Sequence, residues 1–290
     1  MAQLQSALNM LFAVSLLSLL APAAVEAAAA VNKNPPCSVP PPKEDFLNTL
    51  HEFRVQEANA TAMALAGRAQ AQVNTYVHII AEDRTFRGGY VDQATIDKQM
   101  SMLNSNFANT GFSFVLRDVD YTVDPYYARL KSNNDEWYLK RSLRKGDYKD
   151  LNLYYFVNMF TGNTGWCYYP TGVNQGDSNF IRDGCVMHVG TMPGGSYSPW
   201  NQGKLTSHEV GHWMGLLHTF DGGCNSGDYV DDTPFEASAA YGCPTGRDTC
   251  SQPGQDPIHN FMDYSDNACQ NQFTTGQINR MWSFWNYYRA

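Results

Sequence analysis

Apolar residues recur along the chain with two different periods, and these periods predict both strands and helices. The stretch 76–81 largely alternates apolar and polar residues, as a half-buried strand does, whereas Ile96, Met100 and Leu103 follow helical spacing. By the same patterns we expect helices at 46–72, 94–107, 136–143 and 275–288, and strands at 76–81, 112–119, 151–159 and 185–189. Helices and strands intermixed in this order indicate an α/β (α+β) fold, with helices packed on a twisted mixed sheet.

Regular patterns fade after residue 220 and return only with the closing helix. With 290 residues, 43% of them hydrophobic, the chain can bury a sizeable core, and we expect one domain of two lobes. The formal net charge is -8 and the pI is about 5.3. This acidity argues against nucleic acid as a partner.

The amino terminus carries a targeting signal. Residues 8–20 are mostly apolar and are followed by Ala21-Pro22-Ala23 and Val25-Glu26-Ala27, small-residue patterns that suit signal peptidase. The region before them lacks Lys and Arg, but the apolar run is too short and too interrupted for a good membrane span. We therefore expect a signal peptide at 1–27, and a secreted, extracellular protein with no stable membrane association. The sequon Asn59-Ala60-Thr61 predicts glycosylation of Asn59, consistent with export.

The seven cysteines are consistent with an oxidising compartment. Four of them lie between residues 224 and 269, in sequence with few regular signals, and are expected to staple it by disulfides. Four cysteines allow three connectivities, and their spacing does not choose among them. A second zinc site built from thiols is the alternative, although the chain has no C-x-x-C pair.

The segment from His208 to His218 reads H-E-x-x-H-x-x-G-x-x-H. On a helix, His208 and His212 lie one turn apart on the same face, so both can bind one ion. Gly215 can take the positive φ that ends a helix and turns the chain back, so that His218 becomes the third ligand. Three imidazoles leave a fourth position for water, as catalytic zinc requires, and neutral imidazole suits Zn²⁺. Glu209 is then the expected general base; the plainer alternative is a core helix that happens to carry histidines.

The run HEVGHWMGLLHTF at 208–220 resembles the pappalysin-type metzincins, the peptidase M43 family, and most of all the secreted fungal extracellular metalloproteases of that group. The segment 260–264 resembles their methionine turn. The resemblance is specific from 208 to 277 and poor before Asn59. It implies a metzincin-like zinc protease with one catalytic Zn²⁺ on the three histidines, Glu209 as base, Met262 as the apolar floor of the site, and Tyr264 as a catalytic phenol near the ion.

The same resemblance implies the disulfides Cys224–Cys250 and Cys243–Cys269, and Cys167–Cys185 then remains by elimination. It divides the chain into a signal peptide at 1–27, an extension or short prosegment at 28–62, an amino-terminal catalytic lobe with the zinc helix at 63–218, and an irregular, disulfide-stapled lobe at 219–290 that ends in a helix.

The function implied is that of a secreted, monomeric zinc metalloendopeptidase that digests extracellular protein. A protein or peptide substrate would lie extended beside an edge strand near 185–189. The alternatives are a zinc hydrolase of a non-peptide amide and a zinc-stabilised binding protein without turnover. Glu209 discriminates against the last, because a pure binding protein has no need of a base.

Other residues allow two interpretations each. Asp228, Asp231 and Asp232 are either a Ca²⁺ site or solvated turn residues. Cys37, in a proline-rich arm, is either a latency switch that takes the open position on zinc or a spare thiol. Some relatives hold a basic substrate side chain with an acidic residue at position 268, but Ala268 here makes a strict preference for Arg or Lys doubtful. His188 and His259 are expected to be structural, because three ligands are already in place.

Overall fold

The computed structural model describes residues 37–59 and 70–290. The predicted signal peptide lies outside the described residues, as do the side chain of Asn59 and the rest of its sequon. None of the described helices is long and apolar enough to cross a membrane.

A five-stranded sheet forms the centre of the fold, in the order β2-β1-β4-β7-β6. The first four strands run parallel, and β6 pairs antiparallel with β7 at one edge. A two-stranded sheet pairs β3 with β5. The strands are β1 (Ala71–Ala81), β2 (Phe112–Val123), β3 (Arg129–Leu130), β4 (Leu151–Phe156), β5 (Asn158–Met159), β6 (Gly165–Cys167) and β7 (Cys185–His188).

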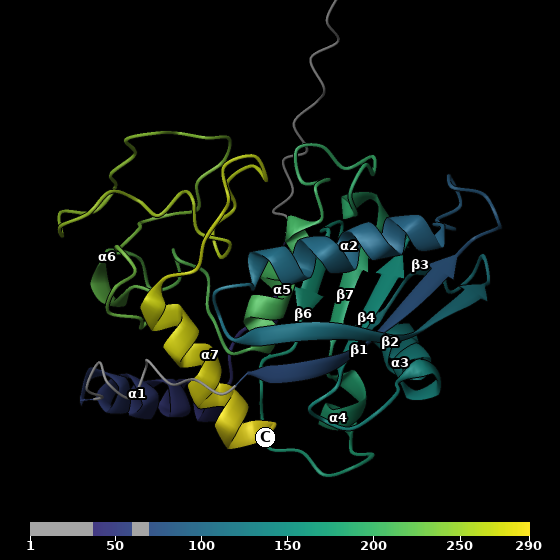
Figure 1. The fold of residues 1–290 in the computed structure, drawn as a ribbon, viewed down its shortest axis with the longest axis horizontal. Coiled ribbons are helices and arrows are strands. Elements are labelled where there is room, and N and C mark those ends of the chain that lie inside the picture. Colours follow the sequence, from purple (N-terminus) through teal and green to yellow (C-terminus); the bar gives the residue numbers. More distant parts are fainter. Residues whose placement is uncertain (1–36, 60–69) are drawn as a thin grey trace, which may run out of the picture. The chain divides into compact units, whose positions relative to one another are not determined.

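Helices cover both faces of the main sheet (Figure 1). The helices are α1 (Glu44–Asn59), α2 (Gln93–Asn106), α3 (Asn133–Leu143), α4 (Ser178–Arg182), α5 (Lys204–Trp213), α6 (Gly223–Ser226) and α7 (Thr275–Tyr288), with a short 3₁₀ turn at Val189–Thr191. Neighbouring residues of β4 face opposite ways: Tyr155 packs in the core beneath α2 and α5, whereas Tyr154 and Phe156 pack with Leu139 of α3. These two buried layers confirm the mixed α/β fold.

After α5 the chain is mostly irregular until α7. Disulfides Cys224–Cys250 and Cys243–Cys269 lie in this region, and Cys167–Cys185 joins β6 to β7 where the two strands pair. These are the three pairs expected. α7 begins with a capping box, in which Thr274 and Gln277 bond each other's backbone, and it packs beside α1.

Three predicted elements differ from the structure. Of the helix expected at 46–72, residues 46–59 belong to α1 and residues 60–69 lie outside the described residues. Residues 71–72 instead open β1, where pairing with β2 outweighs the helical preference of Ala and Gln. The strand expected at 151–159 divides into β4 and β5, which belong to different sheets. The edge strand expected near 185–189 is β7, which lies inside the sheet. The edge is instead formed by β6, which is too short to show a periodic pattern.

Candidate metal centre

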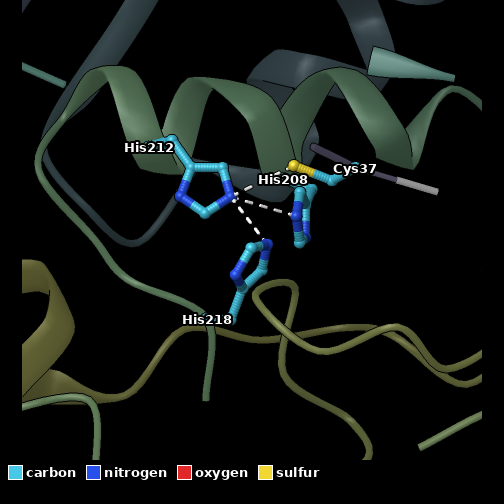
Figure 2. Close-up of side chains that lie close together, drawn as sticks. All are labelled: Cys37, His208, His212 and His218. Atoms are coloured by element: carbon cyan, nitrogen blue, oxygen red, sulfur yellow. Dashed lines mark hydrogen bonds between the residues drawn. The ribbon is translucent and has the colours of Figure 1, made fainter. Parts of the chain in front are cut away.

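Three histidines meet beside helix α5 (Figure 2). His208 and His212 lie one turn apart on α5, and Gly215 then reverses the chain with a φ of 94°. A Cβ at Gly215 would lie 2.2 Å from Cδ2 of Phe284, so both the conformation and the space require glycine. The reversal carries His218 back toward the helix. Nε2 of His212 lies 3.2 Å from Nε2 of His208 and 3.1 Å from Nε2 of His218.

Each imidazole makes its second contact with an acceptor. Nδ1 of His208 donates to the Phe261 carbonyl at 2.6 Å, and Nδ1 of His212 donates to the Leu216 carbonyl at 2.7 Å. Nδ1 of His218 lies 3.1 Å from a carboxylate oxygen of Asp221. These partners fix the proton on Nδ1 and orient the rings, as the second contacts of metal-binding histidines commonly do.

The histidines therefore present unprotonated nitrogens to one point. Burial, followed by the charge of the neighbouring His218, lowers the pKa of His208 to about 3 and that of His212 well below its usual range. With the protons on Nδ1, the Nε2 atoms carry lone pairs, and lone pairs this close repel unless a cation lies between them. The donor set consequently fits a metal ion, and neutral imidazoles suit zinc.

Cys37 completes this cluster from the amino-terminal side. Its Sγ lies 3.5 Å from Nε2 of His212, and the four possible ligand atoms all lie within 4.8 Å of one another. Burial, followed by the nearby Glu209 carboxylate, raises the pKa of the thiol. Residues 37–43, here called the strap, meet the edge strand β6 at their start: Cys37 bridges Gly165 in parallel, and the Ser38 amide donates to the Gly165 carbonyl at 3.0 Å.

Glu209 lies next to this cluster with its side chain fully buried. Neither carboxylate oxygen has a hydrogen-bond partner among the described residues, which is costly unless a further group binds there. Burial raises the pKa of Glu209 well above its usual range. A Cβ at Gly165 would come within 2.8 Å of Oε1, so the absence of a side chain on β6 leaves room for this carboxylate.

The segment expected as a methionine turn lies beneath α5. A Cβ at Gly211 would come within 2.3 Å of Sδ of Met262, so the thioether contacts the helix between the two histidines. The Tyr264 hydroxyl lies 3.1 Å from Nε2 of His218 and donates to the Cys37 carbonyl at 2.9 Å. Burial raises the pKa of this phenol, so it stays protonated and can donate.

The three candidate calcium ligands do not come together. Asp231 pairs with Arg54, Asp232 accepts from the Gly276 amide, and the buried Asp228 accepts from the Val230 amide, with its pKa raised to about 7 by burial. Within residues 37–59 and 70–290, the histidine and cysteine cluster is the one group suited to a metal ion. The calcium interpretation is therefore unsupported.

Two other histidines and Ala268 lie apart from the cluster. Nδ1 of His188 accepts from the Gly190 amide, and Nδ1 of His259 donates to the Cys269 carbonyl, so both have structural contacts. Ala268 is exposed. Sequence reasoning missed Asp221 and Gly165. The signal for Asp221 was a carboxylate three residues after the third histidine, whereas nothing local distinguishes Gly165.

Comparison with known proteins gives consistent matches. A model of the peptidase M43 family, described as pregnancy-associated plasma protein-A, matches residues 143–286. An extracellular metalloprotease of Podospora anserina is 48% identical over 264 residues, which cover 87% of this chain and 89% of the relative. One from Pyricularia oryzae is 47% identical over 267 residues, which cover 91% and 93%.

The fold also resembles solved structures of Tannerella forsythia mirolysin. Mature mirolysin in complex with a cleaved peptide matches with a TM-score of 0.62 and 25% identity, over 74% of this chain and 91% of that one. A promirolysin mutant matches with a TM-score of 0.64 and 23% identity, over 84% of this chain and 89% of that one.

Proposed function

The chain belongs to the peptidase M43 family of metalloproteases, and from this premise we propose that it is a secreted zinc endopeptidase in which Glu209 is the general base. The observation that carries the proposal is the convergence of three histidine Nε2 atoms beside a buried carboxylate that has no hydrogen-bond partner among the described residues. The names of the fungal relatives and the three disulfides support export.

In this proposal His208, His212 and His218 hold the ion. Zinc bound there would polarise the scissile carbonyl and acidify the attacking water. Glu209 accepts the proton of that water and passes it to the leaving amine; its raised pKa suits both steps. Met262 supports the helix from below. The Tyr264 phenol donates a hydrogen bond to the oxyanion that forms at the substrate carbonyl.

The substrate binds along β6 rather than β7. β6 has one open edge, and its Gly165 carbonyl already accepts a backbone hydrogen bond from the strap. An extended protein or peptide substrate would use the same edge by strand addition. The strap must then leave before a substrate can bind.

We further propose that Cys37 holds the unprocessed enzyme latent. A thiolate is a good zinc ligand and would take the position that water needs. The prosegment would be residues 28–62, after the signal peptide at 1–27; the catalytic lobe at 63–218 and the disulfide-stapled lobe at 219–290 would form the mature enzyme. In support, Sγ of Cys37 lies 3.5 Å from Nε2 of His212, within the cluster of possible ligand atoms. Cys37→Ser should raise the activity of the unprocessed chain, and unchanged activity would contradict the switch.

The proposed activity is tested in the Cys37→Ser background, which removes the thiol that would bind zinc and hold the strap over the site. We expect this chain to cleave casein, to lose the activity with a zinc chelator, and to regain it with added zinc. Glu209→Ala should still bind one zinc ion but lose cleavage, whereas the exposed Glu52→Ala control should keep both. Casein cleavage that survives Glu209→Ala or the chelator would refute the assignment. Zinc binding without cleavage in any variant would favour a binding protein.

A further inference from the structure

α1 packs against the body of the enzyme through an apolar face. Phe46, Leu50 and Phe53 project from one side of α1, and Leu50 is fully buried. The Phe46 ring lies 4.4 Å from that of Tyr169 and 5.0 Å from that of Phe284, centre to centre, and the Phe53 ring lies 5.0 Å from that of Phe284. The helix α1 is therefore attached to the rest of the enzyme through packed aromatic rings.

Polar contacts at the far end of α1 fix its register. Glu57 accepts from Nε of Arg280 at 3.1 Å, from Nη2 of Arg280 at 3.0 Å, and from Ser283 at 2.8 Å. The Arg280 side chain is only 1% exposed, so the loss of Glu57 would leave a buried positive charge without this ion pair. Arg54 adds an exposed pair with Asp231 at 2.8 Å. The body thus offers a complementary surface for α1, the α1-binding face, made of Tyr169, Leu217, Arg280, Phe284 and Tyr288.

The strap and α1 form one segment with two separate attachments. At one end Cys37 contacts the histidine cluster, and at the other end Glu57 forms an ion pair with Arg280. Every contact described above joins the segment to residues after position 160. These contacts are non-covalent, so they do not require an intact peptide connection between α1 and β1.

We propose that the segment 37–59 remains docked on the α1-binding face after the chain is cut between α1 and β1, and that it then acts as a separable inhibitor. The proposal rests on the latency proposed above and extends it: α1 supplies the affinity and Cys37 blocks the site. Activation consequently takes two events, a cut and then the destruction or displacement of the segment. Once released, the same segment binds another copy of the enzyme.

The first test keeps the whole chain and replaces residues 60–69 with the recognition site of a specific protease. After cutting, we expect the amino-terminal fragment that contains residues 37–59 to coelute with the body in size-exclusion chromatography, and casein cleavage to stay at the uncut level. Phe53→Ala with Glu57→Ala should release the fragment on cutting and produce activity. Glu52→Ala, an exposed change on the same helix, should behave like the unmodified sequence.

The second test measures binding between separate molecules. The cut double variant, freed of its fragment, is titrated with a labelled synthetic peptide of residues 37–59, followed by fluorescence anisotropy. We expect the peptide to bind and to inhibit, the Glu57→Ala peptide to bind at least tenfold more weakly, and the Glu52→Ala peptide to bind as tightly as the unmodified one.

The outcomes separate this inference from the proposed function. Loss of the fragment on cutting the unmodified sequence, or full activity while the fragment still coelutes, would overturn the inference and leave the protease assignment intact. Equal weakening by Glu52→Ala and Glu57→Ala would also overturn it, because the docked register would then not matter. Persistent coelution without peptidase activity in any variant would instead refute the proposed function.

Discussion

Gly211 gives the sharpest test of how the methionine turn supports the metal centre. The residue lies inside α5, directly before His212, and its conformation is helical. In an exposed helix interior, Gly→Ala stabilises a protein by about 1 kcal/mol, because alanine is the better helix former. Here the new methyl group would lie 2.3 Å from Sδ and 3.2 Å from Cε of Met262, well inside contact distance.

The steric effect is expected to decide the sign. Overpacking a filled core costs about 1–3 kcal/mol, and the fully buried Met262 has little space to move into although its side chain is flexible. Subtracting the helical gain leaves a net loss of up to about 2 kcal/mol for Gly211→Ala. The shift of Met262 should also move α5 and weaken metal binding.

The measurement is urea denaturation of the zinc-loaded chain, repeated with Met262→Ala and with both changes. Met262→Ala alone should cost about 2–5 kcal/mol as a cavity. In the double variant the new methyl group occupies part of that cavity. The loss of unfolding free energy in the double variant should therefore be smaller than the sum of the two single losses by about 1 kcal/mol or more. A stabilisation of about 1 kcal/mol by Gly211→Ala in the native background would refute the contact on which this reasoning rests.

Two further predictions concern charges near the site. Asp221→Asn keeps a hydrogen-bond partner for His218 but removes the negative charge. It should weaken zinc binding about tenfold, the lower end of the range for such partners, because Asp221 is 36% exposed. Competition with a chelator measures the zinc affinity, with Asp248→Asn as the control, and an unchanged affinity would contradict the orienting role of Asp221. Burial, together with the neighbouring Asp263 and Asp256 carboxylates, raises the pKa of Glu236 to about 8 even though Arg247 pairs with it. The folded state therefore binds more protons than the unfolded chain: the stability from Glu236 is fully present below about pH 4, and falls as the pH rises to about 8. Glu236→Gln should flatten the fall in thermal midpoint between pH 5 and pH 8, Glu52→Gln should not, and equal slopes in all three chains would exclude this cause.

Elements with signals inside their own sequence were predicted well. The closing helix matches α7 at both ends, because Thr274 and Gln277 mark its start and its apolar spacing is unbroken. The helix expected at 46–72 was right over 46–59 and wrong at residues 71–72, because Ala71 and Gln72 favour a helix locally, whereas their strand partners lie far away in sequence. β6 was missed for a similar reason: its three residues are all buried by neighbours, so no alternation is visible.

The residues of the candidate metal centre also fall into those that local sequence predicts and those that it does not. His208, Glu209 and His212 follow from helical spacing, and Gly215 predicts the reversal that brings His218 back. No local pattern predicts that the site would lie against β6, because that depends on the order of strands in the sheet. The interpretation of β7 as the edge was consequently wrong, and the space that Gly165 leaves for Glu209 became visible only in three dimensions.

The second contacts of the three imidazoles explain how the mostly irregular region after α5 can hold a precise site. They come from Phe261 beside the methionine turn, from Leu216 in the reversal after α5, and from Asp221 beyond it. A bound ion would therefore tie together segments that share no regular backbone pairing, and its binding energy would contribute to folding of this region. Disulfides Cys224–Cys250 and Cys243–Cys269 restrict the same region in the unfolded chain. The disulfides, together with a bound ion, would thus take the place of regular backbone pairing between α5 and α7.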